Sequence, residues 1–458
     1  MKIHKNNVKL YFKDKNTIIA LCLFFVFLCA FLISFAPFAT SVKGISELFS
    51  TSKVKDLYSN NYSVIYAVDE DDVLHYSFNK SSPGHLNEYA GIESLDNEYG
   101  DATSHFYNFI TIDYDFGNIV KVDGFRDNVF GLDGYTLVLT EINDLYLLYN
   151  NAEAFVKILS DVIDVDAGYA NFTVLTKDYQ VYEFILKGGY LYQFNPQIED
   201  VRMISTQGHL KISNDATTDF RQYTSYYVTS QNKVIQNQIT VDYNRMHLYS
   251  QQDKSEIIKE IQEESLLQTK EMISNLLVKN ICSIENATFI LTQQQELYAI
   301  GNNYIDDDYG IFGIGLGVDS YDTFTPILHG LKDIENIYTT GTFALVLQTK
   351  NDFYYSGNIG YASSSTFKKI TEFGKIDQII GGYYSTIVLK DDILYYVDYD
   401  NHNEMIRMYD NFIVEYVVKY LSLFLMVMIL FYLVVYFFEQ NSKYNRYFKR
   451  RYEDESKK

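Results

Sequence analysis

Two patterns of apolar residues divide the chain. Near each end lies a long apolar run without charges, over residues 17–36 and 420–438. Between the two runs, short stretches alternate apolar and polar residues, and this period of two is typical of β-strands with one buried face. The pattern therefore predicts a β-rich middle region between two hydrophobic helices.

The first apolar run predicts a transmembrane helix over residues 17–37. Its twenty uncharged residues, Thr17–Ala36, would rise about 30 Å as a helix, which matches the hydrocarbon core of a bilayer. A cleaved signal peptide is the alternative, but its apolar region is usually about 7–15 residues long. A small-residue cleavage site is found only around Ala39–Ser41, so the sequence favours an uncleaved anchor.

The second apolar run predicts a transmembrane helix over residues 412–438, whose uncharged part is Tyr420–Phe438. Glu415 and Lys419 precede that part, and their spacing places them on one face of a helix, where they can pair. A functional charge inside the membrane is the alternative. We favour pairing at the interface, because long side chains near the end of a span usually reach the headgroups.

Basic residues flank both apolar runs on their outer sides. The N-terminal segment 1–16 contains five lysines, and the tail 439–458 contains seven lysines and arginines. Positive charge marks the cytoplasmic side of a membrane helix, so we expect cytoplasmic termini and an extracellular or lumenal main domain. Anionic lipid headgroups are the expected partner of the tail, because it follows a membrane helix. Its basic residues nearest that helix are Lys443, Arg446, Lys449, Arg450 and Arg451.

A unit of two strands recurs along the middle region. Each copy combines an apolar strand that ends in Val/Ile-Leu-Thr or a variant, a short polar turn and a Tyr-rich strand. Most copies follow an apolar leader strand, such as residues 159–167. Repeats of roughly 40–50 residues made of short strands predict a propeller or a solenoid. The clearest copies begin at Gly134, Gly168, Glu285, Gly341 and Gly382, and looser copies begin at Ser63 and Tyr223.

One copy carries a longer motif. LYAIGNN (297–303), GIFGIGLG (310–317), a proline in TPILHGL and the strand IENIYTTGTFALVLQ follow one another. This order resembles a repeat of the regulator of chromosome condensation family, LYxWGxNxxGQLGxG followed by a proline, a leader and a Gly-strand. Ile300 stands at the tryptophan position, and the other copies keep only the strand skeleton. The resemblance covers 276–400 well and 63–400 loosely, and it implies a β-propeller of about seven four-stranded blades.

The glycine-rich motif is interpreted as structural, because its glycines suit turns with positive φ and close approach between strands. A phosphate-binding loop is excluded, because no Lys-Ser/Thr follows and Asp306, Asp307 and Asp308 would repel phosphate. These three aspartates are weak candidates for Ca²⁺ ligands, and an ordinary solvated acidic loop is favoured. The residues with an expected structural role in the repeats are Gly301, Gly310, Gly313, Gly315, Pro326, Gly341 and Gly382.

The expected fold class is all-β, with the propeller over 45–408 between the two transmembrane helices. Residues 253–279 interrupt the repeats, and Ile257, Ile261 and Met272 share one side of an amphipathic helix. We expect this inserted helix to pack on the propeller rim. A helix that docks a partner or a second copy is the alternative.

The net charge and the reactive residue types exclude several classes of function. The formal net charge of −21 disfavours nucleic acid as a partner. Cys282 is the one cysteine outside the apolar runs, so no disulfide is expected within the main domain, and its place in a leader strand predicts a buried, inert thiol. The histidines are scattered, and HExxH, CxxC and GxSxG are absent. We therefore expect no catalytic residue, cofactor or resident metal.

The leading functional hypothesis is a membrane-anchored extracytoplasmic propeller that serves as a protein-binding or scaffolding module and is not an enzyme. The nucleotide-exchange activity of the family it resembles is not carried over, because fold does not determine function. A sensor that signals through its two helices is one alternative. A hydrolase or lyase in the propeller channel is another, but it needs converging carboxylates or histidines, which the Thr-rich and Tyr-rich strands expected there lack.

Overall fold

The structure is a computed structural model. Contacts within the chain define two compact units, residues 1–51 with 409–458 and residues 52–408. We describe each unit by itself. The residues that the structure describes are 24, 54–59, 64–78, 110–125, 134–149, 154–168, 170–187, 190–211, 220–242, 265–284, 287–305, 309–340, 344–381, 385–398, 406–407, 421, 423–432, 442, 445–446 and 449–450.

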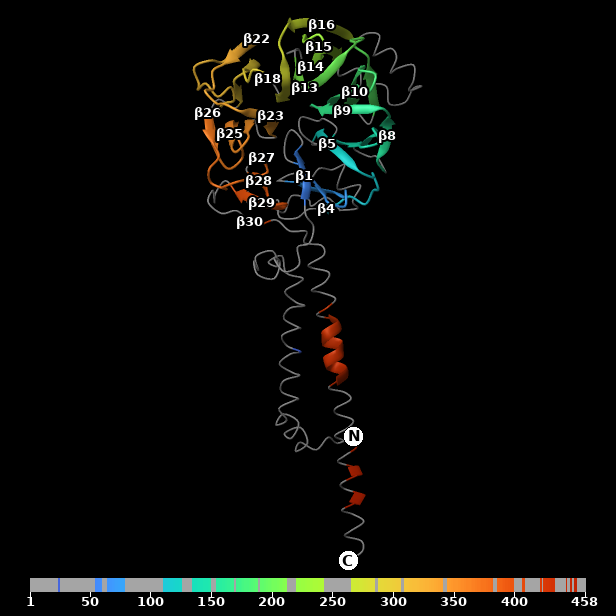
Figure 1. Ribbon diagram of the computed structural model, residues 1–458. Helices are drawn as coiled ribbons and strands as arrows, with labels where there is room; N and C mark the ends of the chain where they lie inside the picture. The colour runs from blue at the N-terminus through green and yellow to red at the C-terminus, as the bar shows by residue number, and fades with distance from the viewer. Residues whose placement is uncertain are drawn as a thin grey trace, which may run out of the picture. The chain divides into compact units, whose positions relative to one another are not determined.

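Residues 52–408 form a β-propeller. Its described strands build seven four-stranded antiparallel sheets, or blades, around a common centre (Figure 1). Blade 1 contains β1 (Val54–Ser59), β2 (Val64–Asp69), β3 (Leu74–Phe78) and β4 (Ile110–Thr111), blade 2 contains β5 (Ile119–Phe125), β6 (Tyr135–Thr140), β7 (Leu145–Tyr149) and β8 (Val156–Leu159), and blade 3 contains β9 (Val162–Ala167), β10 (Asn171–Thr176), β11 (Val181–Lys187) and β12 (Tyr190–Phe194).

The remaining four blades follow in chain order. Blade 5 also carries a small ribbon, β20 (Tyr304–Ile305) with β21 (Tyr309–Gly310). Blade 4 contains β13 (Val201–Lys211), β14 (Phe220–Thr229), β15 (Val234–Asp242) and β16 (Leu266–Ile273), blade 5 contains β17 (Val278–Ile284), β18 (Ala287–Thr292), β19 (Leu297–Asn302) and β22 (Ser320–Ile327), blade 6 contains β23 (Ile334–Thr340), β24 (Ala344–Thr349), β25 (Phe353–Asn358) and β26 (Ser363–Lys369), and blade 7 contains β27 (Gln378–Gly381), β28 (Ser385–Lys390), β29 (Ile393–Asp398) and β30 (Ile406–Arg407).

The predicted repeat is confirmed, because each of its seven copies forms the second and third strands of one blade. The second strand is the most buried, and every residue of β2, β6, β10 and β18 is buried. Both faces of such a strand pack against neighbouring blades, which explains its nearly continuous apolar sequence. Tyr135 of blade 2 and Phe172 of blade 3 show this packing, with ring centroids 5.5 Å apart.

The leader strands are the first strands of the blades and face the centre of the ring (Figure 1). Neighbouring leaders contact one another, as β5 contacts β9 and β9 contacts β13. A β-bulge shifts the register near the start of β1, β5, β9, β13, β17 and β23. A bulge bends a strand and re-aims its side chains, so the second residue of each of these six leaders is displaced from the regular ladder.

In blades 2, 4, 5 and 6, the threonine that ends the second strand closes the hairpin turn to the third. Its hydroxyl oxygen accepts a backbone N–H beyond the turn, which satisfies a donor that the ladder leaves free. In blade 1, Asp69 takes this place and accepts the N–H of Val73 at 2.9 Å. The recurrent Val/Ile-Leu-Thr motif therefore has a structural cause. The threonine bonds are Thr140 with Asp144 at 3.2 Å, Thr229 with Lys233 at 3.3 Å, Thr292 with Glu296 at 3.0 Å and Thr349 with Asp352 at 3.1 Å.

The ring closes without a shared strand, because the first and last blades each contain four consecutive strands. Elsewhere the hairpin turn of one blade accepts a bond from the next leader, as when Val162 N–H donates to Asn143 O at 2.9 Å. Val54 N–H donates to Asp392 O at 3.1 Å and repeats this bond between blades 7 and 1. Gln378 adds a second link, since its amide donates to Leu57 O at 2.6 Å and accepts from Leu57 N–H at 3.2 Å.

The glycine-rich motif of blade 5 forms a compact loop around buried Asn303. The Asn303 side chain donates to Gly315 O at 3.1 Å and to Val318 O at 2.7 Å, and it accepts the N–H of Phe312 at 2.8 Å. Gly313 has a φ of +74°, and a Cβ there would lie 2.2 Å from the ring of Phe367, so only glycine suits this position.

The other predicted repeat residues are distributed around this loop. Gly301 and Gly315 have φ angles of +102° and +85°, Gly310 ends β21, and Pro326 pairs with Tyr298 in blade 5. The predicted structural residues Gly341 and Gly382, and the weak Ca²⁺ candidates Asp306, Asp307 and Asp308, lie outside the described residues.

The helix predicted for 253–279 is wrong in its second half. Leu266–Ile273 forms β16, which pairs antiparallel with β15 as the outermost strand of blade 4. The backbone bonds along the open edge of β15 outweigh the helical period of the apolar residues, because tertiary context overrides local propensity. Residues 253–264 lie outside the described residues.

The terminal unit contains the two predicted membrane segments. Of the second, Leu421 and residues 423–432 are described and helical. Of the first, all but Phe24 lies outside the described residues, as do Lys443 and Arg451 of the tail. Within the described part of the chain, no helix is both long and apolar enough to cross a membrane.

Candidate functional site

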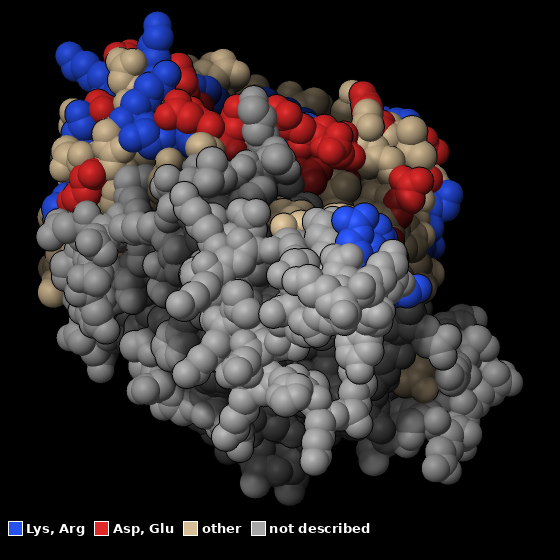
Figure 2. Space-filling model, turned by 90° about the horizontal axis from the view of Figure 1, so that it is seen from below, with Lys and Arg blue, Asp and Glu red and all other residues tan. Residues whose placement is uncertain are grey.

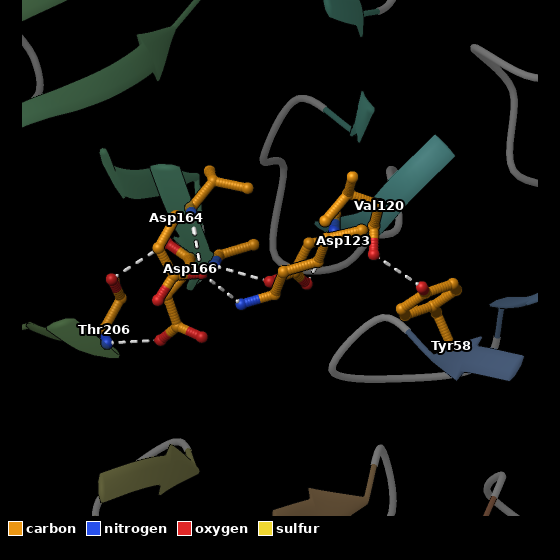
Figure 3. Close-up of polar contacts among 10 residues, drawn as sticks. Tyr58, Val120, Asp123, Asp164, Asp166 and Thr206 are labelled. Carbon is orange, nitrogen blue, oxygen red and sulfur yellow. Dashed lines mark hydrogen bonds and ion pairs between the residues drawn. The ribbon is translucent and has the colours of Figure 1, made fainter. Parts of the chain in front are cut away.

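The leaders of blades 2 and 3 bring four charged side chains together at the centre of the ring. Lys121 and Asp123 lie on β5, and Asp164 and Asp166 lie on β9 (Figure 3). They alternate with core residues such as buried Val122. Since successive side chains of a strand point to opposite faces, the charged residues face away from the core. We call these four residues the axial cluster.

An ion pair connects the two leaders. The Lys121 Nζ lies 3.0 Å from Asp164 Oδ1, and both side chains are about one-third exposed (31% and 37%). The same carboxylate oxygen also accepts the N–H of Val165 at 2.9 Å. The pair therefore bridges blades 2 and 3 and remains accessible to solvent or a ligand.

The other two carboxylates reach across to the next blade. Asp123 Oδ2 accepts the N–H of Ala167 at 3.0 Å, and Asp166 Oδ2 accepts the N–H of Thr206 at 2.6 Å. The hydroxyl of Thr206 also donates to the backbone oxygen of Asp166 at 2.9 Å. These bonds connect blade 2 to blade 3 and blade 3 to blade 4.

Burial and the charges of the cluster shift the pKa values of three of its four residues. Burial raises the pKa of Asp123 and of Asp166 above the usual range, and the nearby ammonium of Lys121 only partly offsets it. Burial lowers the pKa of Lys121, but the three carboxylates of the cluster outweigh that effect and raise it. Perturbed groups that share one site are a recognised mark of function.

Gly124 and Cys282 lie next to the axial cluster. Next to Asp123, Gly124 packs so closely on blade 2 that a Cβ would lie 2.4 Å from the Tyr135 oxygen. Cys282 of β17 is partly exposed. Burial and then the charge of Asp166 raise the pKa of its thiol well above the usual value. The thiol is therefore protonated and unreactive at neutral pH, as expected from its leader strand, although it is not fully buried.

The prediction that the strands around the axis lack converging carboxylates is wrong. The Thr-rich and Tyr-rich strands occupy the second and third positions of each blade, and the leaders line the centre. The signal was present in the sequence, because VIDVDA (162–167) places two acidic residues two apart and IVKVDG (119–124) places a lysine and an aspartate at the same spacing. Within the described residues, no group of His, Cys, Asp or Glu is arranged to hold a metal ion.

Blade 1 contains a second arrangement that the sequence did not reveal. His75 Nε2 lies 3.0 Å from Asp69 Oδ2, and His75 Nδ1 lies 3.1 Å from the hydroxyl of Thr111. The ring is reversed relative to a serine-protease triad, in which Nε2 takes the proton of the nucleophile. Asp69 also closes the hairpin turn through Val73, so we assign this trio to the stability of blade 1.

Glu183 is a third carboxyl with an unusual environment. It is buried between blades 3 and 4, where Asn237 Nδ2 donates to its Oε1 at 2.8 Å and the Tyr227 hydroxyl donates to the same oxygen. Burial raises the pKa of Glu183 to about 7, although hydrogen bonds from Asn237 and Ser225 lower it in part. Its enclosure by the core excludes contact with a partner, so its role is structural.

No protein-family model matches the chain, and a comparison with curated proteins finds no match. Among solved structures, yeast RCC1 (Prp20) bound to Kap60 is similar, with a TM-score of 0.50, 12% identity, and coverage of 74% of this chain and 80% of that chain. Human WBSCR16 is similar with a TM-score of 0.48, 10% identity, and coverage of 74% and 87%. Such low identities show the fold alone. The propeller is thus supported, and the family resemblance of residues 276–400 stays a prediction.

Proposed function

We propose that the propeller is a protein-binding or scaffolding module. The main support is the arrangement of the blades in a ring. The hairpin turn between the second and third strands of one blade lies beside the start of the next blade's leader. Turns from successive blades then form one broad surface, a form suited to protein partners. The similar yeast RCC1 structure is a complex with a protein, Kap60, which supports the same use of this fold here.

We further infer that the chain is an integral membrane protein with an extracytoplasmic propeller. Support comes from the apolar runs at 17–37 and 412–438, the basic residues outside them and the positive-inside rule. The described helical residues of the second run also expose large apolar side chains, including Phe424 and Phe431, as expected of a surface that contacts lipid. The basic tail then lies on the cytoplasmic side against anionic lipids.

Affinity purification of the full chain tests the binding function. The protein, carrying a tag at its C-terminus, is solubilised in mild detergent from the membrane fraction of the cells that make it. We expect one protein in stoichiometric amount, and we expect it to be lost when the propeller is unfolded by the Gly124→Leu substitution. Turnover of a small molecule by the purified chain without a partner would instead favour an enzyme.

Protease protection of intact cells tests the orientation. A protease added outside is expected to cleave the propeller and leave both tails intact. Cleavage confined to the N-terminal segment and the tail 439–458 would reverse the proposed topology. A cytoplasmic protein that stays intact provides the control for cell integrity.

A further inference from the structure

Blades 2 and 3 expose four large apolar side chains beside the hairpin turns. The exposed fractions are 51% for Val120, 71% for Ile142, 39% for Ile163 and 52% for Tyr179. Val120 and Ile163 are the second residues of their leaders, where the bulge displaces the chain. Ile142 and Tyr179 lie in the hairpin turns of the same two blades. We call these residues the apolar patch.

Backbone bonds keep the members of the patch close together. Glu141 N–H donates to Asn118 O at 2.9 Å, which ties the turn of Ile142 to the start of β5. Val162 N–H donates to Asn143 O at 2.9 Å, which ties the same turn to the residue before Ile163. Lys177 N–H donates to Asp161 O at 2.8 Å and brings the turn of Tyr179 to the other side of Ile163.

The patch is particular to blades 2 and 3. The leaders β1, β13, β17 and β23 carry a charged residue where these two carry Val120 and Ile163, so the apolar pair is not a requirement of the fold. The charged residues at this position are Lys55, Arg202, Lys279 and Glu335.

The axial cluster begins directly beside the patch. Lys121 follows Val120 on β5, and Asp164 follows Ile163 on β9, with Asp123 and Asp166 two residues further along. Three carboxylates face one ammonium group (Figure 3). Acidic side chains also form a band on the described surface in Figure 2, beside groups of Lys and Arg. Apolar area therefore adjoins a locally negative site.

We propose that the apolar patch and the axial cluster together bind a protein segment in which one Lys or Arg is flanked by apolar residues. The apolar side chains of the segment cover Ile142, Tyr179 and their neighbours. The basic side chain reaches the carboxylate of Asp164 and, further along the axis, the carboxyl group of Asp166. This inference rests on the proposed protein-binding function and names the chemistry of the partner.

Other occupants fit less well. A nucleic acid or an anionic membrane surface would be repelled by the carboxylates and by the net charge of −21. A free metal ion or small cation would leave the apolar side chains uncovered. A basic residue between apolar ones satisfies both parts, and complementary charge at such a contact favours the correct partner over others.

Selection from a random dodecapeptide library tests the proposal on the full chain in detergent micelles. Enriched peptides are synthesised, and their Kd values are measured by fluorescence anisotropy. We expect the enriched peptides to share a Lys or Arg flanked by apolar residues. Ile142→Ser and Asp164→Asn are each expected to weaken binding by about tenfold or more. Leu328→Ser alters an apolar residue that is 93% exposed elsewhere in the propeller and is expected to leave Kd unchanged.

Three outcomes would overturn the proposal: no enrichment, enriched peptides without a basic residue, or Kd values that Ile142→Ser and Asp164→Asn leave unchanged. Circular dichroism of each variant confirms that the propeller is folded. A partner recovered by affinity purification that binds the Ile142→Ser variant normally would sink this inference and leave the proposed function standing. Failure to recover any partner, together with no peptide enrichment, would contradict both.

Discussion

Asp123 and Asp166 connect the blades and also carry excess negative charge. Each accepts a backbone N–H from the following blade, at Ala167 and Thr206, yet burial raises both pKa values. A carboxyl whose pKa is raised by folding contributes stability that is present below its unfolded pKa of about 3.9 and is lost as the pH rises through the folded value. The axial cluster should therefore become less stable from acidic toward mildly alkaline pH.

The substitution Asp166→Asn tests this sign. The amide oxygen can still accept the N–H of Thr206, while the negative charge is removed. We expect the variant to gain roughly 1 kcal/mol in the free energy of unfolding at pH 8 and much less at pH 4. Urea unfolding at both pH values measures this difference in the free energy of unfolding. Asp161→Asn removes an exposed carboxylate, paired with Lys177, and should change little. A loss of stability at pH 8 would contradict the account.

The close contact at Gly124 gives a second prediction at this scale. A Cβ at this position would lie 2.4 Å from the backbone oxygen of Tyr135, whereas one at Gly317 would meet nothing within 4 Å. Gly124→Ala should cost about 1–3 kcal/mol of stability, as overpacking does, and Gly317→Ala should be close to neutral. Thermal unfolding followed by circular dichroism compares the two. Equal thermal unfolding midpoints for Gly124→Ala and Gly317→Ala would show that the leader of blade 2 can move to accommodate the added Cβ.

Among the elements, the sequence predicts the hairpin of each blade correctly. It wrongly predicts that the strands of these hairpins, and not the leaders, line the centre of the ring. The hairpins repeat a threonine turn whose bond has a local cause, as between Thr292 and Glu296, so the motif survives in the sequence. Which strand lies innermost depends on contacts between the leaders of neighbouring blades, and no local pattern encodes it. The wrong helix prediction for 253–279 has the same cause, because Leu266–Ile273 forms a strand by pairing with the open edge of β15. The carboxylates of Asp123 and Asp166 were missed for this reason.

The threonine turn can be tested in blade 5. The Thr292 hydroxyl accepts the N–H of Glu296 at 3.0 Å, and Thr292 is fully buried. Thr292→Val keeps the shape and removes the acceptor, so it should cost about 1–3 kcal/mol in the free energy of unfolding. Thr292→Ser keeps the hydroxyl and should lose less. If Thr292→Ser is the more destabilised of the two, the methyl group and not the hydrogen bond sets the requirement.

At the scale of the whole molecule, ring closure depends on side chains and turns, because no strand is shared between blades 1 and 7. Gln378 makes two of the closing bonds, both to Leu57. Gln378→Ala should therefore cost about 1–3 kcal/mol and should increase hydrogen exchange in β1 and β27 first. Uniform acceleration across all blades would show instead that the ring opens as a single cooperative unit.

The propeller is proposed to bind a protein through the surface formed by its hairpin turns. A direct test places a photo-crosslinking amino acid at the positions of Ile142, Tyr179 and Leu328 in turn, in the full chain within the cells that make it. We expect one protein to be crosslinked strongly from Ile142 and Tyr179 and weakly from Leu328. The absence of a crosslinked protein from every position would contradict this proposal.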